Sequence, residues 1–88
     1  MEYDKTLYDF FRNALKEYRK SHRITQVQVG TAIGKSSSYI ADIECGFRII
    51  DYPKMSAITE IFNLTVEDFI YINDMKIREE IEINDFKN

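Results

Sequence analysis

The sequence predicts an all-α fold, a bundle of five helices in one domain. The 88 residues include only three glycines and one proline, which leaves few turn signals to separate the strands of a sheet. Apolar residues recur at intervals of three and four, the spacing of one face of a helix. A length of 88 residues with 44% hydrophobic and 31% charged residues suits a single small globular domain with a thin core.

The first helix is expected to begin at Thr6, because Asp9 follows three residues later in a pattern typical of a capping box. It is expected to end near residues 21–23. Its apolar residues lie at helical spacing and form one stripe: Leu7, Phe10, Phe11, Ala14, Leu15 and Tyr18. Its basic residues lie off this stripe: Arg12, Lys16, Arg19 and Lys20.

Two short helices are expected next, over residues 26–33 and 37–44. Each is preceded by a polar residue that caps a helix N-terminus, and each is followed by a glycine that readily adopts the left-handed backbone of a helix C-terminus. These capping positions are Thr25 with Gln28, Gly34, Ser36 and Gly46.

Two further helices complete the bundle. Pro53 fits the first turn of the fourth, where its missing N–H costs nothing, and this helix is expected to close at residues 63–64. Thr65 with Asp68 forms a cap that opens the fifth helix. The spacing beyond it, over residues 71–88, fits either helix or strand. The buried face of the fourth helix is expected to consist of Met55, Ile58, Ile61 and Phe62.

The net charge of −3 is unevenly distributed. Residues 10–50 carry seven basic and three acidic side chains, whereas the remainder of the chain is strongly acidic. A phosphate backbone responds to a local patch of charge more than to the total. The asymmetry therefore fits nucleic-acid binding, and an ordinary solvated charged surface remains the alternative.

The stretch 26–44 carries the functional prediction. Two helices that cross at a wide angle need a residue without bulk where they touch, and Gly30 meets that need. Ile40 and Ile43 anchor the second helix from one side only, so its opposite side faces outward. A helix presented in this manner fits the major groove of B-DNA. The outward positions are Ser37, Ser38, Ala41 and Asp42.

The run of residues 26–46 resembles the helix-turn-helix domains of the phage repressor/Cro-like family, also called lambda-repressor-like or XRE-type. The shared features are the Thr-Gln opening, the turn glycine Gly34, the Ile40 and Ile43 pair, and Glu44-x-Gly46. The flanks 15–20 and 64–69 resemble the first helix of that family and the start of its fifth.

The resemblance implies a compact five-helix lambda-repressor-like bundle with a central helix-turn-helix, occupying residues 1–70. Residues 71–88 would form a C-terminal extension, a candidate dimerisation or partner element. The resemblance also implies a sequence-specific transcription regulator, commonly a small dimeric repressor or controller that docks its recognition helix on double-stranded DNA.

The resemblance assigns base reading to Ser37, Ser38 and Asp42, and a role in holding the fold to Glu44. It matches Gln26, Tyr39 and Arg48 to positions that contact phosphate. We expect the basic residues Arg23 and Lys35, at the edges of the motif, to contact phosphate as well.

Simpler roles stay open for several of these residues. The serines at 36–38 also fit an N-cap, Tyr39 also fits a packing role, and Arg23 also fits a solvated surface. The predicted reading surface has no Arg, Asn or Gln, the bidentate readers worth ~1–3 kcal/mol each. We therefore expect modest sequence specificity, or specificity supplied partly by DNA shape.

No catalytic or cofactor site is expected. The single His22 and the single Cys45 are not arranged as a nucleophile with its base, and the three glycines match no phosphate-binding loop. No metal, cofactor or small-molecule ligand is therefore expected. The sequence has no run of ~20 apolar residues and no leader-like start, so we expect no membrane association. The single Cys45 cannot form an intramolecular disulfide, which favours a reducing, cytoplasmic location.

Two functions from different classes therefore remain. The helix-turn-helix resemblance and the basic segment favour a DNA-binding regulator. The acidic net charge and the weak reading residues favour the alternative, an antitoxin or adaptor that uses the same fold to hold a protein partner.

Overall fold

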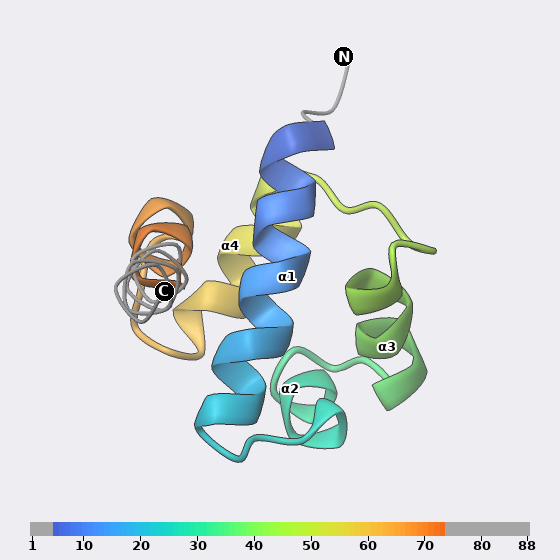
Figure 1. The fold of residues 1–88 in the computed structure, drawn as a ribbon. Helices are drawn as coiled ribbons and strands as arrows, with labels where there is room; N and C mark the ends of the chain where they lie inside the picture. The colour runs from blue at the N-terminus through green and yellow to red at the C-terminus, as the bar shows by residue number, and fades with distance from the viewer. Residues whose placement is uncertain (1–4, 74–88) are drawn as a thin grey trace, which may run out of the picture.

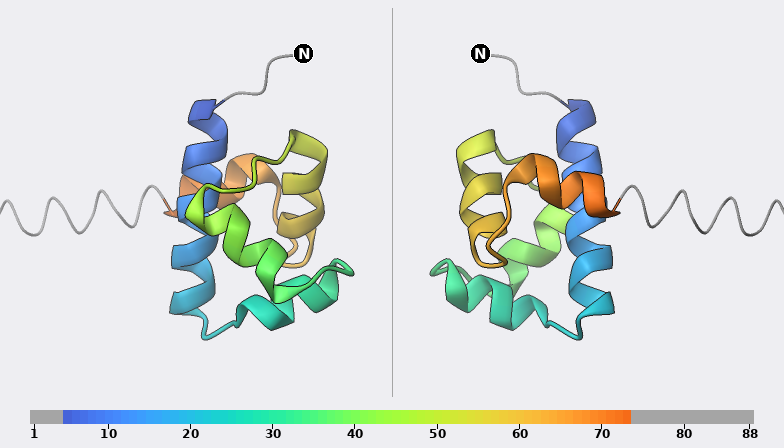
Figure 2. Two further views of the ribbon diagram at one scale, coloured as in Figure 1. Left: turned by 90° about the vertical axis from the view of Figure 1, so that its right-hand side faces the viewer. Right: turned by 90° about the vertical axis from the view of Figure 1, so that its left-hand side faces the viewer.

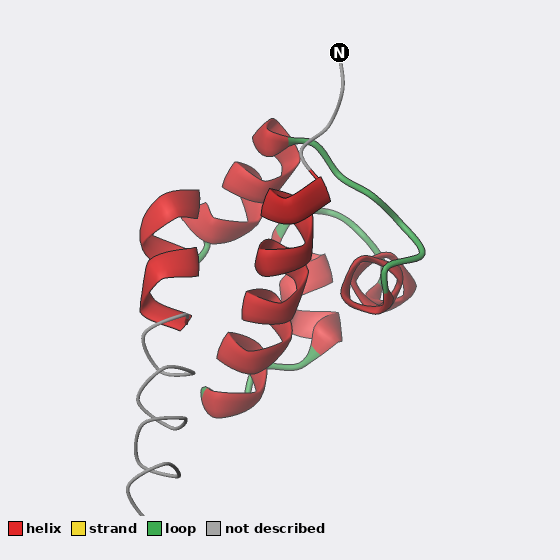
Figure 3. Cartoon of the chain, turned by 45° about the horizontal axis from the view of Figure 1, so that its top comes forward, coloured by secondary structure: helices red, strands yellow, loops and turns green. Residues whose placement is uncertain are grey.

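The computed structural model describes residues 5–73, and every regular element in this range is a helix (Figure 1). In chain order these are α1 (Lys5–Ser21), α2 (Gln26–Ala32), α3 (Ser37–Cys45), α4 (Tyr52–Glu60) and a fifth helix over residues 66–73. Short loops join them (Figure 3). The all-α prediction and the expected order of helices are confirmed over this range.

The five helices surround one core, with α1 and α4 in the middle of the bundle. Figure 2 shows α3 on one side of this pair and the fifth helix on the opposite side. The short helix α2 lies across the end of α1 and leads into α3 (Figure 1). The recognition helix expected from the sequence therefore lies on the outside of the bundle.

The core is built from apolar side chains of all five helices. Phe11 of α1 meets Phe69 of the fifth helix, with ring centroids 5.8 Å apart. Burying one such side chain contributes ~1.5–3 kcal/mol, so packing rather than helix propensity stabilises these short helices. The other fully buried apolar side chains are Leu15, Val29, Ile40, Ile43, Ile58 and Val66.

Two residues assigned to buried faces lie at the surface, so this part of the prediction is wrong. Phe10 is 53% exposed, because Phe11 points into the core and successive positions on a helix differ in direction by about 100°. Ile61 is 36% exposed, because α4 ends at Glu60, earlier than expected, and Ile61 falls in the following turn.

The start of α1 also differs from the expectation. The helix begins at Lys5, so Thr6 lies within its first turn and does not cap it. The carboxylate of Asp9 instead accepts a hydrogen bond from Arg12 Nε at 3.1 Å, one turn further along the helix.

The other expected caps are confirmed. Thr25 and Gln28 form a reciprocal capping box, and both expected turn glycines have positive φ. Asp51 caps α4 by accepting a hydrogen bond from the Lys54 N–H at 3.1 Å. The remaining caps are Ser36 Oγ on the Tyr39 N–H and Thr65 Oγ1 on the Asp68 N–H.

The fifth helix crosses the predicted boundary at residue 70, and residues 74–88 of the expected C-terminal extension lie outside the described part of the chain. The division into 1–70 and 71–88 stays a prediction. Within residues 5–73 no helix combines the length and the apolar character that a membrane crossing requires.

Candidate nucleic-acid interface

The turn between α2 and α3 passes directly against Gly30. A Cβ at this position would lie 2.6 Å from the carbonyl oxygen of Lys35 and 2.9 Å from that of Ser36. The Lys35 N–H donates to the Gly30 carbonyl oxygen at 2.8 Å, which fixes this approach. The expected need for a residue without bulk is therefore real, and it arises from the turn and the cap of α3.

The back of α3 is held by apolar packing and by one ion pair, whose carboxylate is buried. Ile40 and Ile43 are completely buried, as predicted. Arg19 of α1 donates from Nε and Nη2 to the two carboxylate oxygens of Glu44, both at 2.9 Å. The hydrogen bond and the charge of Glu44 hold the pKa of Arg19 above its ordinary value, although burial opposes this. Glu44 therefore ties α3 to α1.

Gln26 joins the same buried pair. Its side-chain amide donates to Glu44 Oε1 at 3.3 Å, which links the start of α2 to α3 and α1. An amide nitrogen carries two protons, so this bond leaves a second N–H on Gln26.

The end of α3 and the following loop are fixed by α1. The hydroxyl of Tyr8 lies 2.9 Å from the carbonyl oxygen of Ile43 and 2.8 Å from that of Arg48, and donates its proton between them. Arg12 Nη1 donates to the carbonyl oxygen of Glu44 at 3.3 Å. The N–H of Arg48 donates in turn to the carbonyl oxygen of Asp42 at 3.0 Å. This loop is thus anchored through its backbone.

These two anchoring roles, of Tyr8 and Arg12, are not evident from the sequence. The sequence pattern places Arg12 only among the basic residues off the apolar stripe, and it predicts for Tyr8 only a packing role in or near the core. Both act on residues more than thirty positions away, so no local periodicity reveals them.

The outward face of α3 carries the three predicted base-reading residues. Ser38 is exposed, and Ser37 and Asp42 are half-buried. Within the described residues none of these three side chains forms a hydrogen bond or an ion pair. Their polar groups are therefore not engaged by the rest of residues 5–73.

Three predicted phosphate contacts gather at one place. The Lys35 ammonium lies 5.3 Å from the centroid of the Tyr39 ring, and the Arg48 guanidinium carbon lies 4.9 Å from it. Both distances are within the range of a cation–π interaction. We call Lys35, Tyr39 and Arg48 the cation cluster. Arg23 does not belong to it, since this exposed residue lies in the turn between α1 and α2 with φ +56°.

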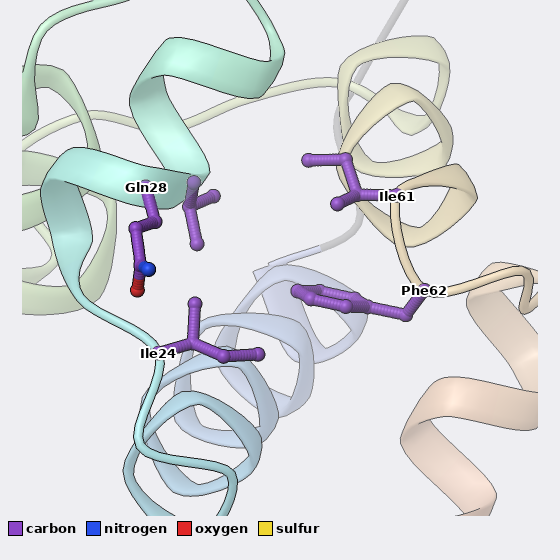
Figure 4. A pocket seen from close by; sticks show the side chains of 5 residues that line it. Ile24, Gln28, Ile61 and Phe62 are labelled. Carbon is purple, nitrogen blue, oxygen red and sulfur yellow. The ribbon is translucent and has the colours of Figure 1, made fainter.

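A pocket of about 280 Å³ lies elsewhere, between α2 and the end of α4 (Figure 4). It shares no residue with the outward face of α3 or with the cation cluster, and its volume is below the ~300–1,000 Å³ typical of ligand pockets. Its lining consists of Ile24, Gln28, Val29, Ile61 and Phe62. In the part of the chain that is described, no three His, Cys, Asp or Glu residues are grouped as metal ligands.

Comparison with known proteins agrees with this geometry. A helix-turn-helix family model matches residues 15–69, more than half of the chain, and spans α2, α3 and α4. No curated protein and no solved structure matches the chain. The chain therefore belongs to the helix-turn-helix family of the phage-repressor-like, XRE type, a family of DNA-binding transcription regulators rather than enzymes.

Proposed function

We propose that this protein is a homodimeric repressor that inserts α3 of each copy into the major groove of an operator. The observation that carries the proposal is the contrast between the two sides of α3. Its back is locked by buried isoleucines and by the Arg19–Glu44 pair, while its front presents polar groups without partners in the described residues. A helix held in this way is positioned to read base edges.

In this proposal the base contacts come from the front of α3. Ser37 and Ser38 offer hydroxyls that both donate and accept, and Asp42 accepts from a donor such as cytosine N4. These groups discriminate less than bidentate readers do, so DNA shape contributes to the choice of operator.

Contacts to phosphate supply most of the affinity. Lys35 and Arg48 contact one stretch of the phosphate backbone beside α3, and Tyr39 lines the same stretch through its ring. Gln26 uses its second amide N–H, and Arg23 contributes charge from the α1–α2 turn. Cations that neutralise phosphates release counterions, so binding weakens as the salt concentration rises.

Dimerisation is proposed at the fifth helix and the following residues. Tyr71 and Ile72 are both exposed on this helix. The helix itself lies on the opposite side of the bundle from α3 (Figure 2). Pairing through them leaves both copies of α3 uncovered. Reading of one operator by both copies further requires that both α3 helices face the same duplex, at half-sites about one helical turn, ~34 Å, apart. A repressor of this kind acts in the cytoplasm, where it occludes a promoter.

Fluorescence anisotropy on a labelled duplex tests the proposal. Binding is expected at low salt, and log K should fall linearly with log salt by about 0.9 for each phosphate neutralised. Selection of bound sites from a random duplex library should then return a two-fold symmetric sequence. Failure to bind any duplex at low salt would contradict the proposal.

A protein-interaction role is the second candidate, and one observation favours it. Phe47, directly after α3, is 84% exposed, and Ile49 beside it is also at the surface. A stable complex with a protein partner that is lost in Phe47→Ser, together with absent DNA binding, would support an antitoxin or adaptor. Salt-sensitive duplex binding that survives Phe47→Ser would support the repressor.

A further inference from the structure

The members of the cation cluster come from three separate parts of the chain. Lys35 follows the end of α2, Tyr39 lies in the first turn of α3, and Arg48 lies in the loop beyond it. We infer that Tyr39 is a positioning residue whose ring holds the two cations together as one phosphate clamp. The inference rests on the proposed DNA-binding function and deepens it.

The ring is the element that makes this arrangement stable. Two positive side chains drawn to one place repel each other. The negative face of an aromatic ring attracts a cation within about 6 Å, and both cations meet this condition, at 5.3 and 4.9 Å. Tyr39 therefore offsets the repulsion and restricts the directions in which the two flexible side chains extend.

The backbone of each member is already fixed. The Lys35 N–H donates to Gly30, and the Tyr39 N–H donates to Ser36 Oγ. Arg48 is held at its N–H by the Asp42 carbonyl and at its own carbonyl by the Tyr8 hydroxyl. Only the long side chains of the two cations remain free to move, and those are the parts that the ring contacts.

Over residues 5–73, no acidic side chain pairs with the charges of the cluster. Arg12 and Arg19 of α1 are engaged with Asp9 and Glu44. Within residues 5–73 neither Lys35 nor Arg48 forms an ion pair. The cluster therefore presents positive charge beside the outward face of α3, where the phosphates of a docked duplex would run.

Two substitutions of Tyr39 separate the ring from the hydroxyl. Tyr39→Leu removes the ring and keeps apolar bulk, whereas Tyr39→Phe keeps the ring. Binding to a fluorescein-labelled duplex of random sequence at low salt is the readout. Tyr39→Leu is expected to raise the Kd roughly five- to thirtyfold, corresponding to two lost cation–π contacts. Tyr39→Phe is expected to stay within about twofold, since the ring contacts persist.

A double-mutant cycle distinguishes positioning from simple packing. In a Lys35→Ala/Arg48→Ala background, Tyr39→Leu is expected to change the Kd by less than about twofold, because no cations remain to be positioned. The slope of log K against log salt should also fall in this background by about 1–2. An equal loss from Tyr39→Leu in both backgrounds, or a Tyr39→Phe variant as weak as Tyr39→Leu, would overturn the inference.

The free protein supplies an independent readout. Side-chain protons of Lys35 and Arg48 should be shifted upfield by the ring in NMR spectra of the wild type and of Tyr39→Phe, and not in Tyr39→Leu. Wild-type protein that binds duplex but lacks these shifts would refute the clamp and leave the proposed function standing. Wild-type protein that binds no duplex would refute the proposed function and the clamp with it.

Discussion

The back and the front of α3 are built from opposite kinds of contact. The back contains two fully buried isoleucines. It also contains the carboxylate of Glu44, both oxygens of which accept hydrogen bonds from Arg19 or Gln26. The front carries Ser37, Ser38 and Asp42, which have no partners within the described residues. One side of α3 thus holds the helix in place and the other side is free to contact DNA. Substitutions at the back should therefore lower stability, and substitutions at the front should alter DNA binding.

Among substitutions at the back of α3, removal of the cationic partner of Glu44 should cost the most stability. Arg19→Met leaves a carboxylate that is only 3% exposed without its cation, which is expected to cost ~3–5 kcal/mol of stability. Urea denaturation measures this loss. Arg19→Lys, which retains charge but not the two-pronged geometry, is the matched control and should lose less. Equal stability of wild type and Arg19→Met would show that the pair does not hold α3.

Addition of one methyl group at Gly30 tests the turn. Gly30→Ala should gain up to ~1 kcal/mol in helix propensity but lose more, because its Cβ would overlap a backbone carbonyl at 2.6 Å. A net loss of ~1–3 kcal/mol is expected in thermal or urea unfolding. Gly34→Ala is the control: its Cβ meets open space, and only its positive φ of 72° is unfavourable, at ~1 kcal/mol. A stabilised Gly30→Ala would contradict this account.

Substitutions on the front should leave stability unchanged within about 0.5 kcal/mol and alter DNA binding instead. Asp42→Ala is expected to change which operator is preferred, because a base-edge contact discriminates by ~1–3 kcal/mol. Arg48→Ala is expected to weaken all sequences alike and to lower the salt slope by about 1. Competition binding with a panel of duplexes measures both. If the two variants change every sequence equally, Asp42 does not read bases.

The smallest effect on stability is expected from an exposed hydrogen bond between α4 and the fifth helix. The Tyr52 hydroxyl donates to Glu67 at 2.7 Å, which holds the pKa of Glu67 below and the pKa of Tyr52 above their ordinary values. The stabilisation from Glu67 should therefore be present near neutral pH and disappear as pH falls through the lowered pKa of Glu67. The stability difference between wild type and Tyr52→Phe should vanish in acid. A difference that persists there would show that the hydroxyl acts on another group.

Local patterns predicted local features well. The caps at Thr25 and Ser36, the positive φ of Gly34 and Gly46, and the burial of Ile40 and Ile43 all depend on residues a few positions apart. The sequence therefore predicted the helix-turn-helix and the side of α3 that faces inward.

Contacts between distant residues could not be predicted in the same way. The bonds from Tyr8 to Arg48 and from Arg12 to Glu44 span more than thirty residues. The cation cluster is predicted only as three separate phosphate contacts, because the sequence does not reveal that the side chains of Lys35 and Arg48 both lie against the Tyr39 ring. The base-reading assignments remain predictions.

The placement of α3 and the fifth helix on opposite sides of the bundle permits simultaneous occupancy (Figure 2). A molecule that grips the far side through Tyr71 and Ile72 does not obstruct the helix that faces the duplex. Substitutions on the fifth helix can consequently change partner binding without changing the surface of α3, and substitutions on α3 can change DNA binding without changing the surface of the fifth helix.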